Sequence, residues 1–362
     1  MNAFRVGLVG CGLNSENHLM AFSNIKGIRP VAVCDANLTR AKEKASRYDI
    51  KQVFTDFNSM LKLDLDLVDI VTPTPTHAPL SQLALEAGID TLVEKPMATS
   101  SKECLDMIRA AKKSGRTLCV AHNKLFFDSV SQTKKTIEDE QLSVSRMRVS
   151  HYYAHAPFMG KWRLKEESGG LLWDALVHHV YLTEYFLGRA HSVYAIAKKV
   201  KEQAFDSFTL ILQNEKKVGV CEFVWNVHEP LLEFQLFTKE GIRFHADLIH
   251  DFLLKRKRPY KTREVEAIRS FIDDSYIPLI KWTGHLQKLL EIRSYPGAFP
   301  FKRTFPTLIK QLISYLKGAP TSLPITAENG LQTIRVLEAA KKSIKTGKIQ
   351  SPQQIILCVL LI

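Results

Sequence analysis

Residues 4–15 read Phe-Arg-Val-Gly-Leu-Val-Gly-Cys-Gly-Leu-Asn-Ser, an apolar run that leads into a glycine-rich turn. A side chain at Gly10 or Gly12 would obstruct the tight turn or the approach of a pyrophosphate. Asp35 closes the next apolar run, where a carboxylate accepts hydrogen bonds from the ribose hydroxyls of NAD and repels the 2′-phosphate of NADP. The pattern predicts a dinucleotide site that prefers NAD, although the nearby Arg40 could accommodate that phosphate.

The first third of the chain alternates strand-like and helix-like segments. Strands are expected at 4–9, 31–34, 67–71, 91–93 and 117–121, and helices at 14–26, 37–48, 77–87 and 100–114. This order predicts an α/β fold in which a doubly wound parallel sheet carries helices on both faces. Because single cores stop growing near ~250–300 residues, a chain of 362 residues is expected to form two domains. We place a Rossmann domain at 1–123 and a substrate-binding and oligomerisation α/β domain at 124–362.

The second part of the chain is richer in strands. Strands are expected at 144–153, 191–200, 205–213, 217–227 and 231–238, and helices at 169–188 and 327–346. Residues 247–300 are expected to be a variable insertion. The last residues, 355–362, are apolar but too few to span a bilayer, so they are expected to form a final strand, a partner contact or a membrane-surface contact.

Polar residues gather where the first strands end. Ligands of a parallel sheet bind beyond the carboxyl ends of its strands, which is where Thr72, Pro73, Glu94, Lys95, His122 and Asn123 are expected. On the helix expected at 169–188, Asp174 and His178 are four residues apart and therefore share one face. A lysine before proline is commonly only solvated, and an Asp–His pair is commonly a surface pair. Their joint occurrence after a dinucleotide motif favours a catalytic site.

These residue types suit the oxidation of a secondary alcohol. A hydride must leave carbon for a nicotinamide, and a proton must leave oxygen for a base. His178 is the expected base because the ordinary pKa of histidine is near neutrality. Asp174 would grip a substrate hydroxyl or orient the imidazole. The positive charge of Lys95 would stabilise the developing alkoxide.

Five motifs carry a resemblance to a known family. They are Gly10-Cys11-Gly12 with His18, Val-Thr-Pro-Thr-Pro-Thr-His at 71–77, Glu94-Lys95-Pro96, Trp162-Arg163, and Gly-Gly-Leu-Leu-Trp-Asp-Ala-Leu-Val-His at 169–178. With them the chain resembles the glucose–fructose oxidoreductase, inositol dehydrogenase and MocA family (Gfo/Idh/MocA). The resemblance implies a Rossmann domain followed by an α/β domain whose open, mostly antiparallel sheet often mediates oligomer contacts. A homodimer or homotetramer is therefore expected.

The resemblance also implies roles for individual residues. Lys95 is implied to lie beside nicotinamide and substrate, with Asp174 and His178 completing the catalytic site. The implied cofactor-binding residues are Gly10, Gly12, Leu13, Asn14, Asp35, Thr72, Pro73, His77, Glu94 and Lys95. The implied substrate-binding residues are Asn123, Arg163, Asp174 and His178, and no metal is expected. The chain departs from the family pattern at Leu176, where glycine is usual, at Tyr181, where aspartate is common, and at 124–126, which lacks an arginine.

Charge and cysteine content narrow the alternatives for binding partners and for the cellular compartment. The net charge is +13, and residues 123–362 contribute most of it, with 35 basic and 24 acidic side chains. The densest basic run, 255–263, is expected to be a solvated loop, or else to attract an anionic substrate, an anionic membrane surface or, least of all, nucleic acid. Six cysteines without paired or zinc-like spacing, and no secretory signal, favour a reducing cytoplasm.

Together these features predict an NAD-dependent oxidoreductase. Its substrate is expected to be a small polyol: a sugar, a cyclitol or a nucleotide sugar. One alternative is a redox-neutral enzyme that retains its NAD, such as a glycosidase or an epimerising enzyme. Another is a non-catalytic regulator that senses a dinucleotide.

Overall fold

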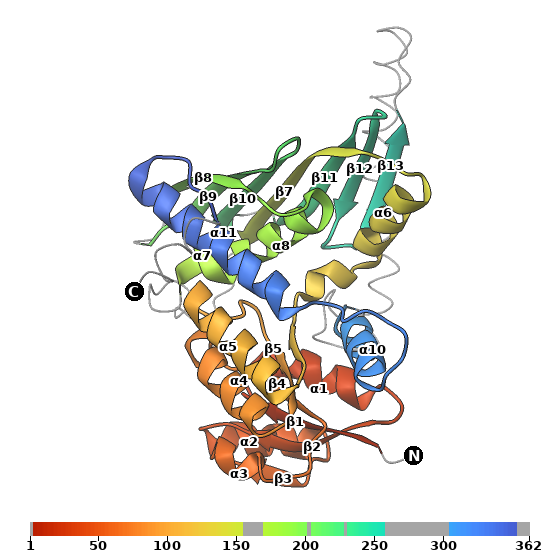
Figure 1. The fold of residues 1–362 in the computed structure, drawn as a ribbon, viewed down its shortest axis with the longest axis vertical. Helices are drawn as coiled ribbons and strands as arrows, with labels where there is room; N and C mark the ends of the chain where they lie inside the picture. The colour runs from red at the N-terminus through yellow and green to blue at the C-terminus, as the bar shows by residue number, and fades with distance from the viewer. Residues whose placement is uncertain (1–2, 155–168, 201–203, 228–229, 258–303, 353–362) are drawn as a thin grey trace, which may run out of the picture.

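Two β-sheets organise the computed structural model, which describes residues 3–154, 169–200, 204–227, 230–257 and 304–352 (Figure 1). The first sheet consists of β1 (Phe4–Val9), β2 (Ile28–Cys34), β3 (Gln52–Phe54), β4 (Leu67–Ile70), β5 (Asp90–Val93) and β6 (Leu118–Val120). Its strands are parallel in the order β3-β2-β1-β4-β5-β6. The order reverses between β1 and β4, which is where doubly wound sheets bind their ligands.

Helices connect these strands. They are α1 (Ser15–Ser23), α2 (Leu38–Arg47), α3 (Phe57–Met60), α4 (His77–Glu86) and α5 (Ser101–Ser114). Because parallel crossovers are right-handed, the helices after β1 and those after β4 cover opposite faces of the sheet. The predicted doubly wound Rossmann sheet is confirmed, but β3 was missed because its three residues are too few to show a periodic apolar pattern.

The second sheet has seven strands in the order β13-β12-β11-β7-β10-β9-β8. They are β7 (Val144–Ala154), β8 (Ser192–Lys198), β9 (Ser207–Gln213), β10 (Val218–Val227), β11 (Leu231–Thr238), β12 (Ile242–Asp247) and β13 (Phe252–Lys257). Neighbouring strands are antiparallel except β7 and β10, which run parallel. Buried residues alternate with half-buried residues along β11, as expected for a sheet that packs one face on a core. The predicted mostly antiparallel sheet is confirmed.

Two predictions for this half were wrong. Lys255 and Arg256 lie in β13, paired with β12, and not in a solvated loop, because the apolar residues 252–254 anchor the strand. The expected single helix at 169–188 is interrupted at Ala175, which separates α7 (Gly170–Asp174) from α8 (Leu176–Leu187). Residues 258–263 of the basic run and the tail 355–362 lie outside the described residues.

Helix α11 (Ala327–Thr346) joins the two sheets. A Cβ added at Gly330 would lie 2.7 Å from the Sδ of Met97, so the helix packs closely on the segment that follows β5. Near its other end, the Ser343 hydroxyl accepts a hydrogen bond from the backbone N–H of Ala195 in β8 at 3.0 Å. Two further helices, α6 (Asp128–Asp139) and α10 (Thr304–Leu316), were not predicted.

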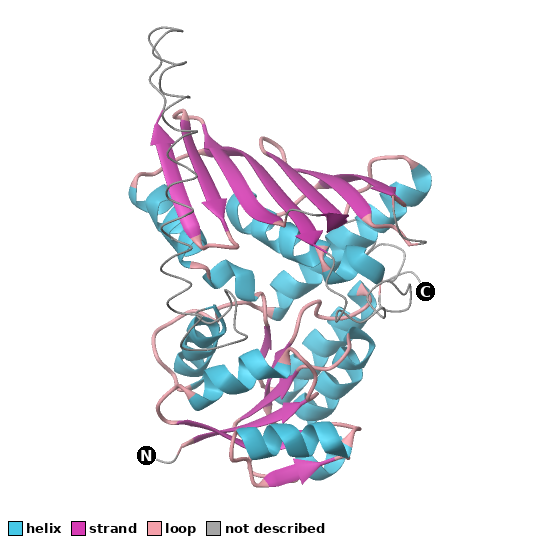
Figure 2. Cartoon of the chain, turned by 180° about the vertical axis from the view of Figure 1, so that it is seen from behind, coloured by secondary structure: helices cyan, strands magenta, loops and turns pink. Residues whose placement is uncertain are grey.

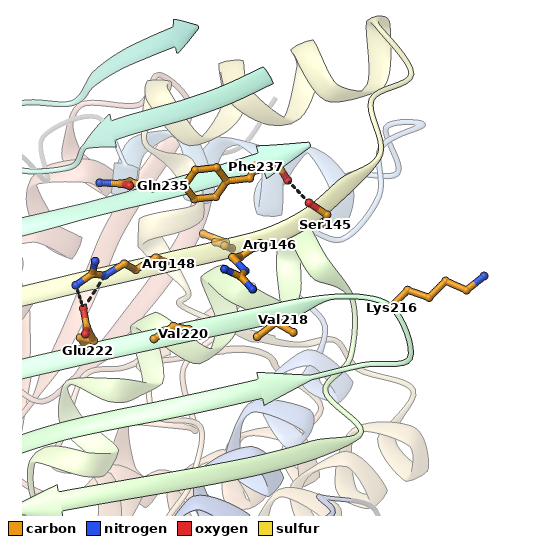
Figure 3. A pocket seen from close by; sticks show the side chains of 10 residues that line it. Ser145, Arg146, Arg148, Lys216, Val218, Val220, Glu222, Gln235 and Phe237 are labelled. Atoms are coloured by element: carbon orange, nitrogen blue, oxygen red, sulfur yellow. Dashed lines mark hydrogen bonds and ion pairs between the residues drawn. The ribbon is translucent and has the colours of Figure 1, made fainter. Parts of the chain in front are cut away.

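The described helices lie on the side of the second sheet that faces the first sheet (Figure 2). The outer face holds a hollow of about 810 Å³ in which Val218 and Val220 lie among charged side chains (Figure 3). Here the guanidinium of Arg148 donates to Glu222 at 2.7 Å. Among the described helices, none combines the length and the apolar character needed to cross a bilayer.

Candidate functional site

The glycine turn brings the ends of β1 and β4 together. Gly10 has a φ of +97°, and a Cβ there would lie 2.5 Å from the backbone oxygen of Val71. Only glycine tolerates that approach. A Cβ at Gly12 would meet no protein atom within 4 Å, and the Ser15 hydroxyl donates to the Gly12 carbonyl at 2.6 Å as α1 begins. The turn is therefore closed on the protein side at Gly10 and open at Gly12, as a pyrophosphate cradle requires.

Asp35 is held beside this turn by backbone donors. The N–H of Cys11 donates to its Oδ2 and the N–H of Asn37 to its Oδ1, each at 2.7 Å. These two bonds fix the carboxylate at the end of β2, where a ribose would lie in a dinucleotide fold. Arg40 is exposed on α2 and, like Asp35, lines the cavity that is described next.

A cavity of about 960 Å³ covers the carboxyl ends of the first sheet. Nine of the ten predicted cofactor-binding residues line it: Gly10, Gly12, Leu13, Asn14, Asp35, Thr72, Pro73, Glu94 and Lys95. The tenth, His77, does not. Its buried ring lies behind the wall, with Nδ1 2.8 Å from the Pro96 carbonyl and Nε2 2.8 Å from the Thr72 carbonyl. Burial lowers the pKa of His77, so the ring is neutral. Its two contacts link two loops of the site.

A buried chain of charged groups supports the backbone of Lys95. His18 places Nδ1 2.7 Å from Asp69 and Nε2 2.9 Å from Glu94, and its side chain is fully buried. Burial alone would lower the pKa of His18, but the two carboxylates raise it to about 10. The second oxygen of Glu94 accepts the N–H of Lys95 at 3.0 Å. His18, which belongs to the first of the family motifs, is thus linked through Glu94 to the predicted catalytic lysine.

Lys95 contacts Asp174 across the two halves of the molecule. Its Nζ lies 3.2 Å from Asp174 Oδ1 and 3.1 Å from the Asp174 carbonyl oxygen, and both side chains are 13% exposed. The peptide bond between Lys95 and Pro96 is cis. The two contacts of its Nζ tether the amine to the last residue of α7, 79 residues away in sequence.

A second cavity, of about 480 Å³, lies between the two sheets and shares its wall with the first. Asn14, Glu94, Lys95 and Asp174 line both cavities. Asn123 and His178 line the second cavity alone, so four predicted residues lie where the cavities meet and six line the second cavity. Arg163 lies outside the described residues.

Tyr181 determines how His178 presents its ring. The Tyr181 oxygen lies 2.7 Å from His178 Nδ1 and accepts the N–H of Lys124 at 3.2 Å. Because a buried hydroxyl left without an acceptor is costly, we infer that Tyr181 donates to Nδ1. The proton of the neutral ring then sits on Nε2. Burial, followed by the charges of Lys124 and Lys95, lowers the pKa of His178 well below its usual value, so the ring is neutral, and its expected role as the base stays a prediction.

Some residues of the second cavity were not predicted. Lys124 follows Asn123 at the end of β6 and had been noted only as the place where an arginine is absent. Trp225, which was also not predicted, lines the same cavity and stacks on Tyr153, a residue that the sequence had suggested beside the substrate, with ring centroids 5.0 Å apart and an interplanar angle of 5°. The two residues lie on neighbouring parallel strands, and knowing that these strands pair would have indicated this aromatic pair. His179, the residue after His178, is fully buried, with its Nδ1 3.1 Å from the Ala175 carbonyl oxygen.

Family models match both halves of the chain. The model described as "Oxidoreductase family, NAD-binding Rossmann fold" matches residues 4–122. The model described as "GFO/IDH/MocA C-terminal domain" matches residues 130–242.

Similar proteins include several sugar and cyclitol dehydrogenases. D-apiose dehydrogenase of Paraburkholderia graminis is 28% identical over 271 residues, which cover 73% of this chain and 72% of that protein. scyllo-Inositol 2-dehydrogenase (NADP(+)) IolW of Bacillus subtilis is 26% identical over 310 residues, covering 82% and 84%. The crystal structure of the WlbA dehydrogenase from Bordetella pertussis, in complex with NADH and UDP-GlcNAcA, has a TM-score of 0.79 at 20% identity, covering 97% of this chain and 98% of that one. This last likeness shows that the fold is shared.

Proposed function

Because the chain belongs to the Gfo/Idh/MocA oxidoreductase family, we propose that it transfers a hydride between a nicotinamide dinucleotide and a secondary alcohol of a sugar, a cyclitol or a nucleotide sugar. The observation that carries the proposal is the contact of Lys95 with Asp174 where the two cavities meet. The names of the apiose and inositol dehydrogenases and the UDP-GlcNAcA complex support these substrate classes. We assign cofactor binding to residues 1–123 and substrate binding to residues 124–362.

The first cavity fits a dinucleotide. The open cradle at Gly12 leaves room for the diphosphate, and the fixed carboxylate of Asp35 faces the place of a ribose. When bound, the nicotinamide supplies the hydride acceptor or donor. Asp35 favours NAD over NADP, because a second negative charge beside it would be repelled. Arg40, which lines the same cavity, is the residue that would weaken this preference.

The second cavity gives each catalytic residue a role. Asp174 holds the amine of Lys95 in place and accepts a hydrogen bond from a neighbouring substrate hydroxyl. Once the Lys95 ammonium has released a proton to solvent, its amine accepts the alcohol proton during oxidation, and the ammonium so formed returns the proton during carbonyl reduction. His178 donates its Nε2–H to the same oxygen and stabilises the charge that develops there. Asn123 offers an amide to a further hydroxyl of a polyol substrate.

A panel assay tests this function. Sugars, inositols and nucleotide sugars are each incubated with NAD and with NADP, and the absorbance of the reduced cofactor is followed. We expect at least one polyol to be oxidised, faster with NAD. No reduction with any compound, together with NAD that stays bound through purification, would instead favour a redox-neutral enzyme.

The outer face of the second sheet suits a second copy of this chain. Val218, Val220 and Phe237 lie there beside the Arg148–Glu222 pair, so the face offers both apolar area and self-complementary charge (Figure 3). We expect a dimer or tetramer in light scattering, and Val220→Arg should shift it toward a monomer. A wild-type monomer at high concentration would contradict this assignment.

A further inference from the structure

Lys124 is a buried lysine at the substrate cavity. It lies in the 3-10 turn η2 (Asn123–Phe126) that follows β6, and its residue is only 4% exposed. It lines the second cavity together with Lys95, Asp174 and His178. Lysine is almost never so buried unless its charge is paired.

The amine of Lys124 has no such partner in the described part of the chain. Its backbone N–H donates to Tyr181, but no hydrogen bond or ion pair of its Nζ is formed there. Burial, followed by repulsion from Lys95, lowers its pKa to about 7, and Asp174 offsets this only in part. The carboxylate of Asp174 is already 3.2 Å from the amine of Lys95.

The groups around Lys124 offer it little negative charge. The charge of Lys124 acts on three histidines from two elements: His151 on β7, and His178 and His179 on α8. Burial, and next the charge of Lys124, lowers the pKa of each, so all three are neutral at physiological pH. Among the described residues that line the cavity, the other carboxylate is that of Glu94, which is engaged by His18 and by the backbone of Lys95.

We propose that the substrate carries a carboxylate and that this carboxylate pairs with the ammonium of Lys124, so that the enzyme acts on a sugar acid. The inference rests on the proposed function and narrows its substrate class. A buried amine without a counter-ion is costly, and an anion that arrives with the substrate removes that cost. One lysine matches the single charge of a carboxylate, whereas a phosphate dianion would leave a charge unpaired.

Binding measurements with matched ligands test the inference without turnover. Isothermal titration calorimetry compares D-glucuronate with D-glucose, D-galacturonate with D-galactose, and UDP-glucuronate with UDP-glucose, with glucose 6-phosphate as a further probe. The proteins are the wild type, Lys124→Met, and Lys113→Met, which removes an exposed lysine of α5. We expect at least one acid to bind the wild type about 10–100-fold more tightly than its neutral partner, since a charge-assisted hydrogen bond is among the strong ones.

In Lys124→Met this preference should fall to nearly equal binding, while the affinity for the neutral partner changes little. Lys113→Met should behave as the wild type. Titrations near pH 8 in two buffers of different ionisation enthalpy should also show that the wild type takes up a proton with the acid, whereas Lys124→Met does not. This proton uptake is a signature that a merely structural lysine would not give.

Three outcomes would overturn the inference: acids that bind no better than neutral sugars, a preference that survives in Lys124→Met, or tightest binding of glucose 6-phosphate. The inference and the proposed function can fail independently of each other. Oxidation of neutral sugars without a Lys124-dependent acid preference would support the dehydrogenase function and contradict a carboxylate on the substrate. Lys124-dependent binding of acids that are never oxidised would support the carboxylate site and contradict the dehydrogenase function.

Discussion

The two cavities meet at Lys95 but are built by different means. The dinucleotide cavity is shaped largely by backbone: the turn at Gly10 and Gly12, the N–H groups that hold Asp35, and the loop at Thr72. The substrate cavity is shaped by side chains from β7, β10, α7, α8 and η2, which are far apart in sequence. A backbone site can serve many enzymes of one fold, whereas a side-chain site determines the individual substrate.

The two cavities also differ in how their polar groups are satisfied. Around the dinucleotide cavity, both ring nitrogens of His18 and of His77 have partners. Around the substrate cavity, the described residues leave His151 Nδ1 buried without a hydrogen bond, and they form no hydrogen bond or ion pair with the Lys124 amine. The first half is not free of such atoms, since Asp69 Oδ1 and Ser81 Oγ are also buried without a partner among the described residues, but His151 lines the substrate cavity, where a ligand can satisfy it.

The largest effect is expected at the residue that the cavities share. Lys95→Met removes the proton acceptor and should lower kcat/KM by about 10³-fold or more, from the combined loss of acid–base catalysis and charge stabilisation. Dinucleotide affinity, measured by fluorescence titration, should change only a few-fold. Lys113→Met serves as the matched control and should keep full activity. Loss of cofactor binding on the same scale as activity would show that Lys95 serves only the cofactor half.

A pair of glycine substitutions tests the backbone origin of the cofactor cavity. Gly10→Ala places a methyl group 2.5 Å from the Val71 carbonyl at a φ of +97°, and should lower the free energy of unfolding by about 2–4 kcal/mol. Gly12→Ala meets no protein atom, so it should leave the free energy of unfolding nearly unchanged and weaken only dinucleotide binding. Thermal unfolding and cofactor titration of both variants give the comparison. Equal destabilisation by the two would contradict it.

His18 offers a pH-dependent test of the support beneath Lys95. Its pKa in the folded protein, about 10, is above the ordinary 6.5. Its contribution to stability is therefore complete below pH 6.5 and lost as the pH rises through 10. His18→Gln should cost about 3–5 kcal/mol near pH 6, as expected when a buried pair loses one partner.

The stability difference between the wild type and His18→Gln should then shrink as the pH rises from 7 to 10, by up to about 1.4 kcal/mol per pH unit. Urea unfolding across this range measures it. His245→Gln is a control, because that histidine pairs with Glu233 on the second sheet, away from Lys95. A constant difference across the range would mean that His18 is not charged in the folded protein.

The smallest effect is expected at Asp35, which affects cofactor choice alone. Asp35→Ser removes the charge that repels a 2′-phosphate and should shift the ratio of kcat/KM for NAD and NADP by about 10–100-fold toward NADP. The additional change Arg40→Ala should reverse part of that shift. If Asp35→Ser left the ratio unchanged, its carboxylate would not face the ribose.

The difference between the backbone-built cofactor cavity and the side-chain-built substrate cavity also explains what the sequence could predict. The dinucleotide half depends on contacts between neighbouring segments, such as Cys11 with Asp35, so its doubly wound sheet followed from local patterns. Nine of its lining residues followed from those patterns together with the family resemblance. His77 was misplaced because its role depends on the Pro96 carbonyl, a contact that only the folded loops create.

The substrate half was predicted less completely. Lys95, Asp174 and His178 could be named, but the break of the helix at Ala175 and the bond from Tyr181 to His178 could not, because both depend on packing between distant segments. Lys124 was missed for a similar reason. Its burial and lack of a counter-ion are properties of the assembled cavity, and an isolated lysine after a strand is commonly solvent-exposed.

The most direct test follows the hydride itself. A polyol substrate found in the panel, deuterated at the reacting carbon, is mixed with enzyme and NAD in a single turnover, and the reduced cofactor is examined by mass spectrometry. We predict that the wild type transfers the deuterium to the cofactor and that Lys95→Met does so at least about 10³-fold more slowly. Transfer at the wild-type rate by Lys95→Met would contradict the placement of catalysis where the two cavities meet.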